Sequence, residues 1–307
     1  MGSLKGILPV LPTPFDKDGE RIDYDSFQKL VDTAITDGAD GLCLFAGGAE
    51  FYKLSEQEKC ELFRLAVEVC DKRVPLIVTV SSHATILAQR EALYAQENGA
   101  SAINIMPPGF ASPNGRMITE HVIDICKTVE IPAIIQYAPA LTGVSISEEA
   151  FKRMNENTDR ELYIKLEAMP TGPAITALRE ATGKRYDIIV GNGGECLYEA
   201  LKRGACAVMP GAALIKPYHM IYDAFVKGDE EGAYRMFCDY LPHVHLMLRD
   251  IEQFVAMEKW ILKKRAVLPY DTCRKPNHYP DAYTLELLEE SVRHMADKFN
   301  LSLRKVR

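Results

Sequence analysis

The sequence has little that points to a metal, a membrane or a nucleic acid. Its eight cysteines form no C-x-x-C pair, and no group of His, Cys, Asp or Glu has the spacing of metal ligands. No apolar run reaches the roughly 20 residues needed to cross a bilayer. The net charge of −7 and the scattered Lys and Arg residues argue against a nucleic-acid surface. We therefore expect no metal, no other cofactor, and neither a membrane nor a nucleic acid as partner.

The N-terminal segment also lacks a targeting signal. Residues 1–6 contain no apolar signal-peptide core, and Gly6 breaks the myristoylation pattern. Most of the cysteines lie in apolar segments, which is typical of reduced thiols in the core of a cytosolic protein. We therefore expect a cytoplasmic protein.

Eight short apolar segments predict the fold. They cover residues 6–11, 41–45, 75–80, 102–106, 132–137, 162–168, 187–190 and 205–209. Segments with helical spacing alternate with them, and one helix follows the capping box formed by Ser55 and Glu58. Near-continuous apolar strands that alternate with helices are typical of a buried parallel sheet. Eight of them favour an α/β fold of the (β/α)8 TIM-barrel type over an open doubly wound sheet, which remains the alternative.

The strands end near Gly228, and the remainder reads as helical. Helical spacing covers residues 230–262 and 284–299, and a proline-containing connector at 268–280 joins the two regions. We predict that residues 1–228 form the barrel that carries the active site. Residues 229–307 are then a C-terminal helical extension, with no linker that would make it independent.

A lysine within a buried strand is the strongest chemical signal. Lys165 lies in the apolar run 162–168, and burial disfavours a charged ammonium. A neutral amine could attack a carbonyl carbon and form a Schiff base. Alternatively, Lys165 could reach water at the strand end or pair with Glu167. Because side chains alternate along a strand, Tyr163, Lys165 and Glu167 share one face.

Barrel enzymes carry their active sites at the carboxyl ends of the strands. That end of this chain holds Tyr137, Lys165 and the glycine-rich turns 46–50 and 191–194. Lysine could supply the nucleophile and tyrosine a proton relay, while backbone N–H groups could hold a carboxylate. The turn at 191–194 and Gly211 could instead bind phosphate, although no Lys or Arg nearby supports this.

These features in this order resemble the dihydrodipicolinate synthase / N-acetylneuraminate lyase superfamily. The resemblance covers most of the chain. It rests on Pro12-Thr13-Pro14-Phe15, the glycine-rich turn before Glu50, Tyr137-x-Pro139 on the fifth strand, Lys165 on the sixth, and the C-terminal helices. It implies a homotetramer in which each subunit acts on a small 2-oxo acid.

The resemblance also implies roles for individual residues. Lys165 would form the Schiff base with the 2-oxo acid, usually pyruvate, and Tyr137 would move protons. The turn at Gly47 and Gly48 would bind the carboxylate of the 2-oxo acid. The full set of predicted substrate-binding residues is Gly47, Gly48, Ala49, Asn192 and Gly193.

Several positions depart from the family pattern. The family turn usually reads Gly-Ser/Thr-Thr-Gly-Glu, whereas residues 46–50 read Ala-Gly-Gly-Ala-Glu, so hydroxyl groups are missing. Leu141 stands where dihydrodipicolinate synthases carry an arginine, and their tyrosine after strand four falls at 108–109, a Pro-Gly pair. The acidic residues that lyases use for a sugar tail are replaced by glycines at 193–194. A more apolar mouth suggests an uncharged or aromatic aldehyde partner, or a short sugar-acid-derived 2-oxo acid.

We predict a Schiff-base aldolase or lyase acting on a 2-oxo acid, either pyruvate or one derived from a deoxy sugar. It would not be a typical dihydrodipicolinate synthase. One alternative is a 2-oxo acid dehydratase of the same superfamily, in which Glu167 could serve as a base. Another is a barrel that binds a small 2-oxo acid without turnover. We interpret Glu50 as a structural residue that bonds to loop backbone.

Overall fold

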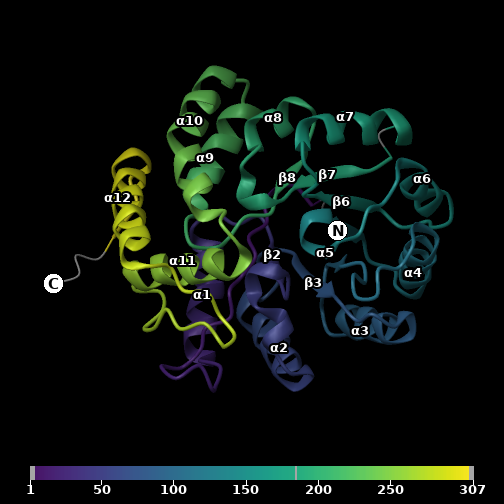
Figure 1. Ribbon diagram of the computed structural model, residues 1–307, viewed down its shortest axis with the longest axis horizontal. Coiled ribbons are helices and arrows are strands. Elements are labelled where there is room, and N and C mark those ends of the chain that lie inside the picture. Colours follow the sequence, from purple (N-terminus) through teal and green to yellow (C-terminus); the bar gives the residue numbers. More distant parts are fainter. Residues whose placement is uncertain (1–3, 184, 304–307) are drawn as a thin grey trace.

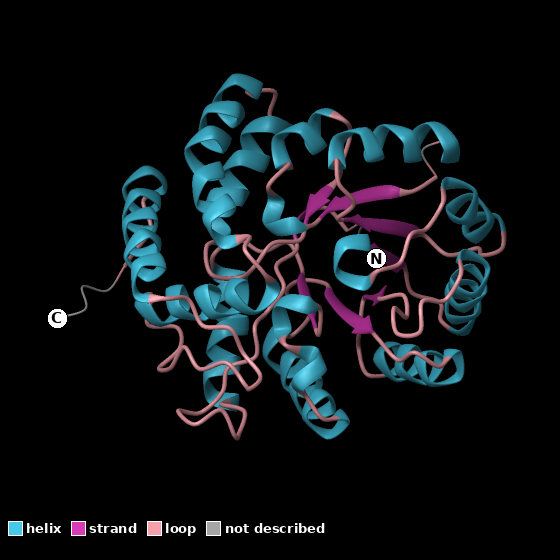
Figure 2. Ribbon diagram, viewed as in Figure 1, coloured by secondary structure: helices cyan, strands magenta, loops and turns pink. Residues whose placement is uncertain are grey.

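Eight parallel strands form one sheet that curls into a barrel (Figures 1 and 2). They pair in the order β1-β8-β7-β6-β5-β4-β3-β2. The computed structural model describes residues 4–183 and 185–303. The prediction that no targeting signal is present concerns residues 1–6, of which the first three lie outside these ranges. The last four residues of the predicted C-terminal extension also lie outside them. The strands are β1 (Gly6–Ile7), β2 (Leu42–Leu44), β3 (Leu76–Val80), β4 (Ala102–Ile105), β5 (Ala133–Tyr137), β6 (Leu162–Leu166), β7 (Asp187–Val190) and β8 (Ala207–Val208).

Val10 closes the ring of strands. It forms parallel bridges with Cys43 on one side and with Gly211 on the other. The Leu11 N–H donates to the Cys43 carbonyl at 3.0 Å, and the Cys43 N–H donates to the Pro9 carbonyl at 2.9 Å. The predicted (β/α)8 barrel is confirmed, and the open sheet is excluded.

The first and last strands are shorter than predicted. Regular pairing covers only two residues in β1 and two in β8, where 6–11 and 205–209 were expected. Pro9 and Pro210 follow these strands and have no N–H to donate to a ladder. The chain stays extended beyond β1 but pairs there only through the isolated bridges of Val10.

Helices surround the strands, as Figure 2 shows in cyan and magenta. Those that follow the strands are α1 (Tyr24–Thr36), α2 (Glu56–Cys70), α3 (Thr85–Glu97), α4 (Gly115–Thr128), α6 (Glu148–Glu156), α7 (Thr171–Thr182), α8 (Leu197–Lys202) and α9 (Ile215–Val226). Short turns interrupt the loops: η1 (Gly47–Ala49), η2 (Phe51–Lys53), α5 (Pro139–Thr142) and η3 (Asn192–Gly194). The capping box that begins α2 is confirmed, because Ser55 and Glu58 each bond the other's backbone N–H.

Strand side chains divide into two packed layers. The larger layer fills the space between the strands and the helices and includes Ile135, Ile164 and Leu166. A smaller cluster fills the barrel interior; it includes Leu8, Val10, Cys43, Ile77, Ala102, Ile134, Tyr163, Ile189, Ala207 and Met209. Since neighbouring residues of one strand belong to different layers, each strand shows the expected alternation.

Three further helices follow the barrel: α10 (Glu230–Met247), α11 (Ile251–Lys264) and α12 (Ala282–Phe299). In Figure 1 they lie together at one side of the barrel, with α12 outermost. Helix α10 packs against α9 and α12, and α11 contacts the turn η1. The predicted boundary at 228–229 falls in the connection between α9 and α10. We retain the division into barrel and extension as a proposal.

A buried ion pair fixes α11 to the barrel. Glu50, just after η1, and Lys259 of α11 are both fully buried and are bonded to each other. Glu50 also pairs with Lys53 at 3.1 Å and accepts the Arg274 N–H at 3.1 Å. A buried charge is tolerated when it is paired and hydrogen-bonded. Glu50 thus bonds to a backbone N–H group, as its interpretation as a structural residue implies, and it also binds the ammonium groups of Lys53 and Lys259.

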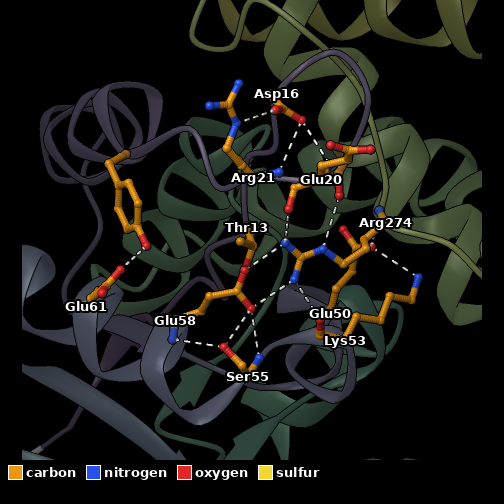
Figure 3. Close-up of polar contacts among 12 residues, drawn as sticks. Thr13, Asp16, Glu20, Arg21, Glu50, Lys53, Ser55, Glu58, Glu61 and Arg274 are labelled. Carbon is orange, nitrogen blue, oxygen red and sulfur yellow. Dashed lines mark hydrogen bonds and ion pairs between the residues drawn. The ribbon is translucent and has the colours of Figure 1, made fainter.

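Arg274, in the connector before α12, extends this network (Figure 3). Its guanidinium binds both carboxylate oxygens of Glu58, at 2.7 and 3.0 Å. It also donates to the carbonyl groups of Gly19, Glu20 and Lys53, at 2.9–3.2 Å. The connector therefore holds together the loops that follow β1 and β2.

Within the described ranges, no helix has both the length and the hydropathy to span a bilayer. All eight cysteines are free, and four of them are buried: Cys43, Cys70, Cys126 and Cys273.

Glu258 of α11 is a second buried carboxyl group, and it forms no ion pair within the described residues. Glu258 accepts the Ala213 N–H at 2.8 Å, and a Cβ at Gly211 would overlap its carboxyl group. Burial raises the pKa of Glu258 to about 7, although backbone N–H donors and Arg265 act in the opposite direction. This carboxyl group also disfavours the phosphate site considered at Gly211.

Glu258 makes stability depend on pH. Between about pH 4.5 and 7 the folded protein retains a proton that the unfolded chain releases, so stability should fall as pH rises through this window and level off above it. Over the whole window the loss is roughly 3 kcal/mol. Glu258→Gln removes this term, so its melting temperature relative to the wild type should rise from pH 4.5 to 7. A difference independent of pH, measured by circular dichroism, would contradict the prediction.

Candidate active site

A cavity of about 440 Å³ opens at the carboxyl ends of the strands. Most of its walls are apolar, and its charged lining residues are Lys165, Glu167, Glu195, Arg249 and Asp250. Apolar walls with a few convergent polar groups are typical of a small-molecule site. The cavity therefore coincides with the place where the sequence predicted the active site.

Lys165 and Glu167 form an ion pair at the inner end of this cavity. Lys165 is 4% exposed, and its Nζ lies 3.4 Å from Glu167 Oε1. Both side chains line the cavity and share one face, because Glu167 follows Lys165 by two positions, just past the end of β6. The predicted burial of Lys165 and its shared face with Glu167 are confirmed. Lys165 is the lysine that lines the cavity.

Glu167 is held by neighbours on both sides. Its Oε2 accepts from Gln136 Nε2 at 3.1 Å, and its Oε1 accepts from the Asn192 N–H at 3.2 Å. The Asn192 side chain donates in turn to the Glu167 carbonyl at 3.3 Å. A Cβ at Gly191 would overlap the Glu167 side chain, so glycine is required there. These contacts leave the carboxylate one orientation, with Oε1 facing Lys165.

The position predicted for Tyr137, beside Lys165, is wrong. The pairing of β5 with β6 places Gln136 opposite Lys165 and Tyr137 opposite Leu166, which belongs to the outer layer. The Tyr137 ring packs edge-on against Phe151 of α6, with ring centroids 5.4 Å apart. Gln136 lines the cavity in its place. The missed signal was local: like Lys165, Gln136 is a polar residue inside an apolar strand.

The turn η1 offers backbone donors but no hydroxyl groups. Gly47 and Gly48 line the cavity, and within the described part of the chain neither N–H has a protein acceptor. The Ala49 N–H is bonded to the Ala46 carbonyl, and Ala49 does not line the cavity. Of the three predicted residues in this turn, two are therefore positioned to meet a ligand. Asn192 and Gly193, predicted from the turn after β7, also line the cavity.

The rim of the cavity comes from the C-terminal helices. Leu248, Arg249 and Asp250 connect α10 to α11, and Ile251 and Phe254 of α11 pack close to η1. No pattern near the strand ends indicated these residues, since they follow β8 by about 40 positions. Arg249 and Leu141 both line the cavity. Arg249 therefore provides a guanidinium group there, although Leu141 stands at the position of the arginine expected from the family resemblance.

Cys43, next to the lysine in the barrel interior, is a neutral thiol. Burial raises its pKa to about 11, against the opposing effects of Lys165 and of the hydrogen bond with Thr79. Its Sγ lies 3.8 Å from Thr79 Oγ1. A protonated, buried thiol is a poor nucleophile. Cys43 is therefore not suited to attack a carbonyl carbon.

Comparisons with known proteins agree with this geometry. Residues 3–294 match the model of the dihydrodipicolinate synthetase family. The chain is 31% identical over 290 residues to the 4-hydroxy-tetrahydrodipicolinate synthase of Bifidobacterium longum strain DJO10A, covering 94% of this chain and 93% of the relative. It is also 31% identical over 280 residues to the L-2-keto-3-deoxyarabonate dehydratase of Azospirillum brasilense, covering 89% and 88%.

Solved structures share the fold. The 4-hydroxy-tetrahydrodipicolinate synthase of Methylacidiphilum fumariolicum SolV superposes with a TM-score of 0.90 at 21% identity, covering 97% of this chain and 98% of the other. The dihydrodipicolinate synthase of Rhodopseudomonas palustris gives a TM-score of 0.87 at 23% identity, with coverage of 95% and 97%. The superpositions cover nearly the whole chain, so these proteins share both the barrel and the C-terminal helices.

Proposed function

The chain belongs to the dihydrodipicolinate synthetase family and is a lyase of that family; from this premise we propose that it forms an imine between Lys165 and a 2-oxo acid and eliminates water from it. The substrate class is a 2-oxo acid derived from a deoxy sugar. The observation that carries the proposal is the contact of 3.4 Å between Lys165 Nζ and Glu167 Oε1. A carboxylate fixed beside the amine places a base next to the carbon that the imine activates.

The first steps follow from the chemistry of the amine. Glu167 takes a proton from Lys165, and the freed amine attacks C2 of the 2-oxo acid. Glu167 then gives this proton to the hydroxyl group of the carbinolamine, which leaves as water to give the protonated imine, and Glu167 is again a carboxylate. The imine draws electrons from C2 and weakens the neighbouring C3–H bond. C3 is two bonds from the imine nitrogen, so the adjacent Glu167 carboxylate is placed to remove a proton from C3.

Elimination completes the reaction. The C4–O bond breaks as the enamine electrons form the C3–C4 double bond, and Glu167 returns its proton to the departing hydroxyl group. The net change is the loss of one water molecule, and hydrolysis of the imine frees the product from Lys165. The free N–H groups of Gly47 and Gly48 hold the substrate carboxylate. The similarity to a dehydratase of a keto-deoxy sugar acid supports this direction.

Aldol cleavage is the second candidate. It would use the same imine, but Glu167 would remove the proton of the C4 hydroxyl, and the C3–C4 bond would break to release pyruvate and an aldehyde. The apolar walls formed by Leu141, Met169 and Phe254 favour an uncharged aldehyde. A barrel that binds the acid without turnover is the remaining alternative, motivated by the missing hydroxyl groups of η1.

We further propose a homotetramer in the cytoplasm. Exposed apolar side chains support an association: Phe110 is 84% exposed and Met169 62% exposed in the single chain. The eight free thiols suit a reducing compartment. Sedimentation at micromolar concentration should give a species of several chains. A single species at the chain mass of 34.3 kDa would contradict the assembly.

The imine can be trapped. Incubation with pyruvate and borohydride should add a reduced pyruvyl group to the peptide that contains Lys165. Lys165→Arg should abolish the adduct, because arginine keeps the charge but cannot form an imine. Tyr137→Phe is the control and should trap like the wild type, since its ring packs against α6. An adduct on another lysine, or none with several 2-oxo acids, would falsify the imine and leave the binding protein as the interpretation.

The products distinguish elimination from cleavage. With a 2-oxo-3-deoxy sugar acid, proton NMR should show loss of water and no pyruvate. Glu167→Gln should still trap the imine but lower kcat by about 100-fold or more, the usual effect of removing a general base. Glu195→Gln is the matched control, because this carboxylate lies at the rim and pairs with His245 at 3.2 Å; its kcat should change by less than about tenfold. Release of pyruvate would instead identify an aldolase.

A further inference from the structure

A row of polar side chains crosses the barrel interior behind Glu167. Thr79 of β3, Asn104 of β4 and Gln136 of β5 are at most 6% exposed. Asn104 Nδ2 donates to Thr79 Oγ1 at 3.2 Å and to Gln136 Oε1 at 2.9 Å. Gln136 Nε2 donates in turn to Glu167 Oε2 at 3.1 Å. The imine chemistry described above makes no direct use of Thr79, Asn104 or Gln136.

The direction of this row is determined from its Glu167 end. An ionised carboxylate only accepts hydrogen bonds, so Gln136 must present its Nε2 there. Its Oε1 then faces Asn104, which must present its own Nδ2. A reversed Gln136 amide would place its oxygen against the carboxylate, and a reversed Asn104 amide would place Oδ1 against Gln136 Oε1. Each amide is therefore held in one orientation by its neighbours.

Such a row is costly inside a barrel otherwise filled by apolar side chains. A buried amide without partners costs several kcal/mol, whereas hydrogen bonds within a polar network restrict the orientation of its members. Asn104 Nδ2 and Gln136 Nε2 are both bonded within the row, while among the described residues Asn104 Oδ1 has no hydrogen-bond partner. The interior residues two positions earlier on these strands, Ile77, Ala102 and Ile134, are apolar, so on β3, β4 and β5 the polar side chains lie at the level of Lys165. The hydrogen-bonded row therefore ends on the carboxylate of Glu167 and restricts its orientation.

We propose that Gln136 is a positioning residue, held in orientation by Asn104, which turns Glu167 so that Oε1 faces the imine. The proposal rests on the proposed function of Glu167 as the base at C3. A tyrosine in this position could transfer a proton, whereas an amide only donates its hydrogen bond. The proton taken from C3 therefore does not leave Glu167 through Gln136, which suits an elimination in which the same carboxyl group returns it.

Exchange of the pyruvate methyl protons in D₂O, followed by NMR, tests this directly, because it reports proton removal from C3 of the imine and needs no sugar acid. Gln136→Met keeps the length of the side chain but removes the Nε2 group that donates to Glu167. It should lower the maximal exchange rate about 10- to 100-fold, change the pyruvate concentration at half-maximal rate less than threefold, and leave borohydride trapping at Lys165 intact.

Asn104→Leu supplies the second variant. It should lower the exchange rate about threefold to tenfold, because Gln136 loses the donor that orients it. Added to Gln136→Met, it should cause no further loss, since both act through one row. Melting temperatures of all variants show whether a loss reflects unfolding, and Asn104→Leu alone carries the test if Gln136→Met does not fold.

The outcomes distinguish the positioning role of Gln136 from the proposed dehydratase activity. An unchanged exchange rate in Gln136→Met or Asn104→Leu, a change confined to the half-maximal concentration, or additive losses in the double variant would overturn the positioning role. Exchange and trapping in the wild type without loss of water from a deoxy-sugar 2-oxo acid would overturn the dehydratase alone. Absence of any adduct in the wild type would overturn both.

Discussion

The arrangement of this site depends on the alternation of side chains along the strands of a closed barrel. Val10 closes the ring between β1 and β2, so each strand residue points either into the interior or toward the helices. This places Lys165 and Glu167 inside together, and it places Gln136 inside and Tyr137 outside. Because Lys165 is buried, its charge needs a partner, and the lysine and the glutamate provide one for each other.

Two buried ion pairs in this barrel have different surroundings and different consequences. The Glu50–Lys259 pair attaches α11 to the turn after β2, and α11 with the preceding connection forms the rim of the cavity. The pair of Lys165 and Glu167 lies at the inner end of that cavity. The first system is completely enclosed and satisfied by protein groups, whereas the second faces a space that can receive a ligand. Burial alone does not distinguish a structural charge from a reactive one; access to a cavity does.

The relatives show how much chemistry one barrel can support. Solved structures superpose with TM-scores near 0.9 at about 21–23% identity, so the fold tolerates replacement of most side chains. The curated relatives at 31% identity include both a synthase and a dehydratase. In this chain the turn η1 carries no hydroxyl groups, and amides occupy the interior beside the lysine.

The sequence by itself determined the eight strands, the helices that follow them, the capping box of α2 and the burial of Lys165, because each depends on a pattern within a few residues. It also indicated the turns at 47–48 and 192–193. The interior face of β5 was predicted wrongly, because both faces of this buried parallel strand are mostly apolar, a shift of one residue exchanges them, and Gln136 alone indicated the interior face. Contacts between distant residues, such as Glu50 with Lys259 and the rim at 248–254 with η1, were decided only by the tertiary structure. They depend on how the C-terminal helices return to the barrel, and no local pattern encodes that return.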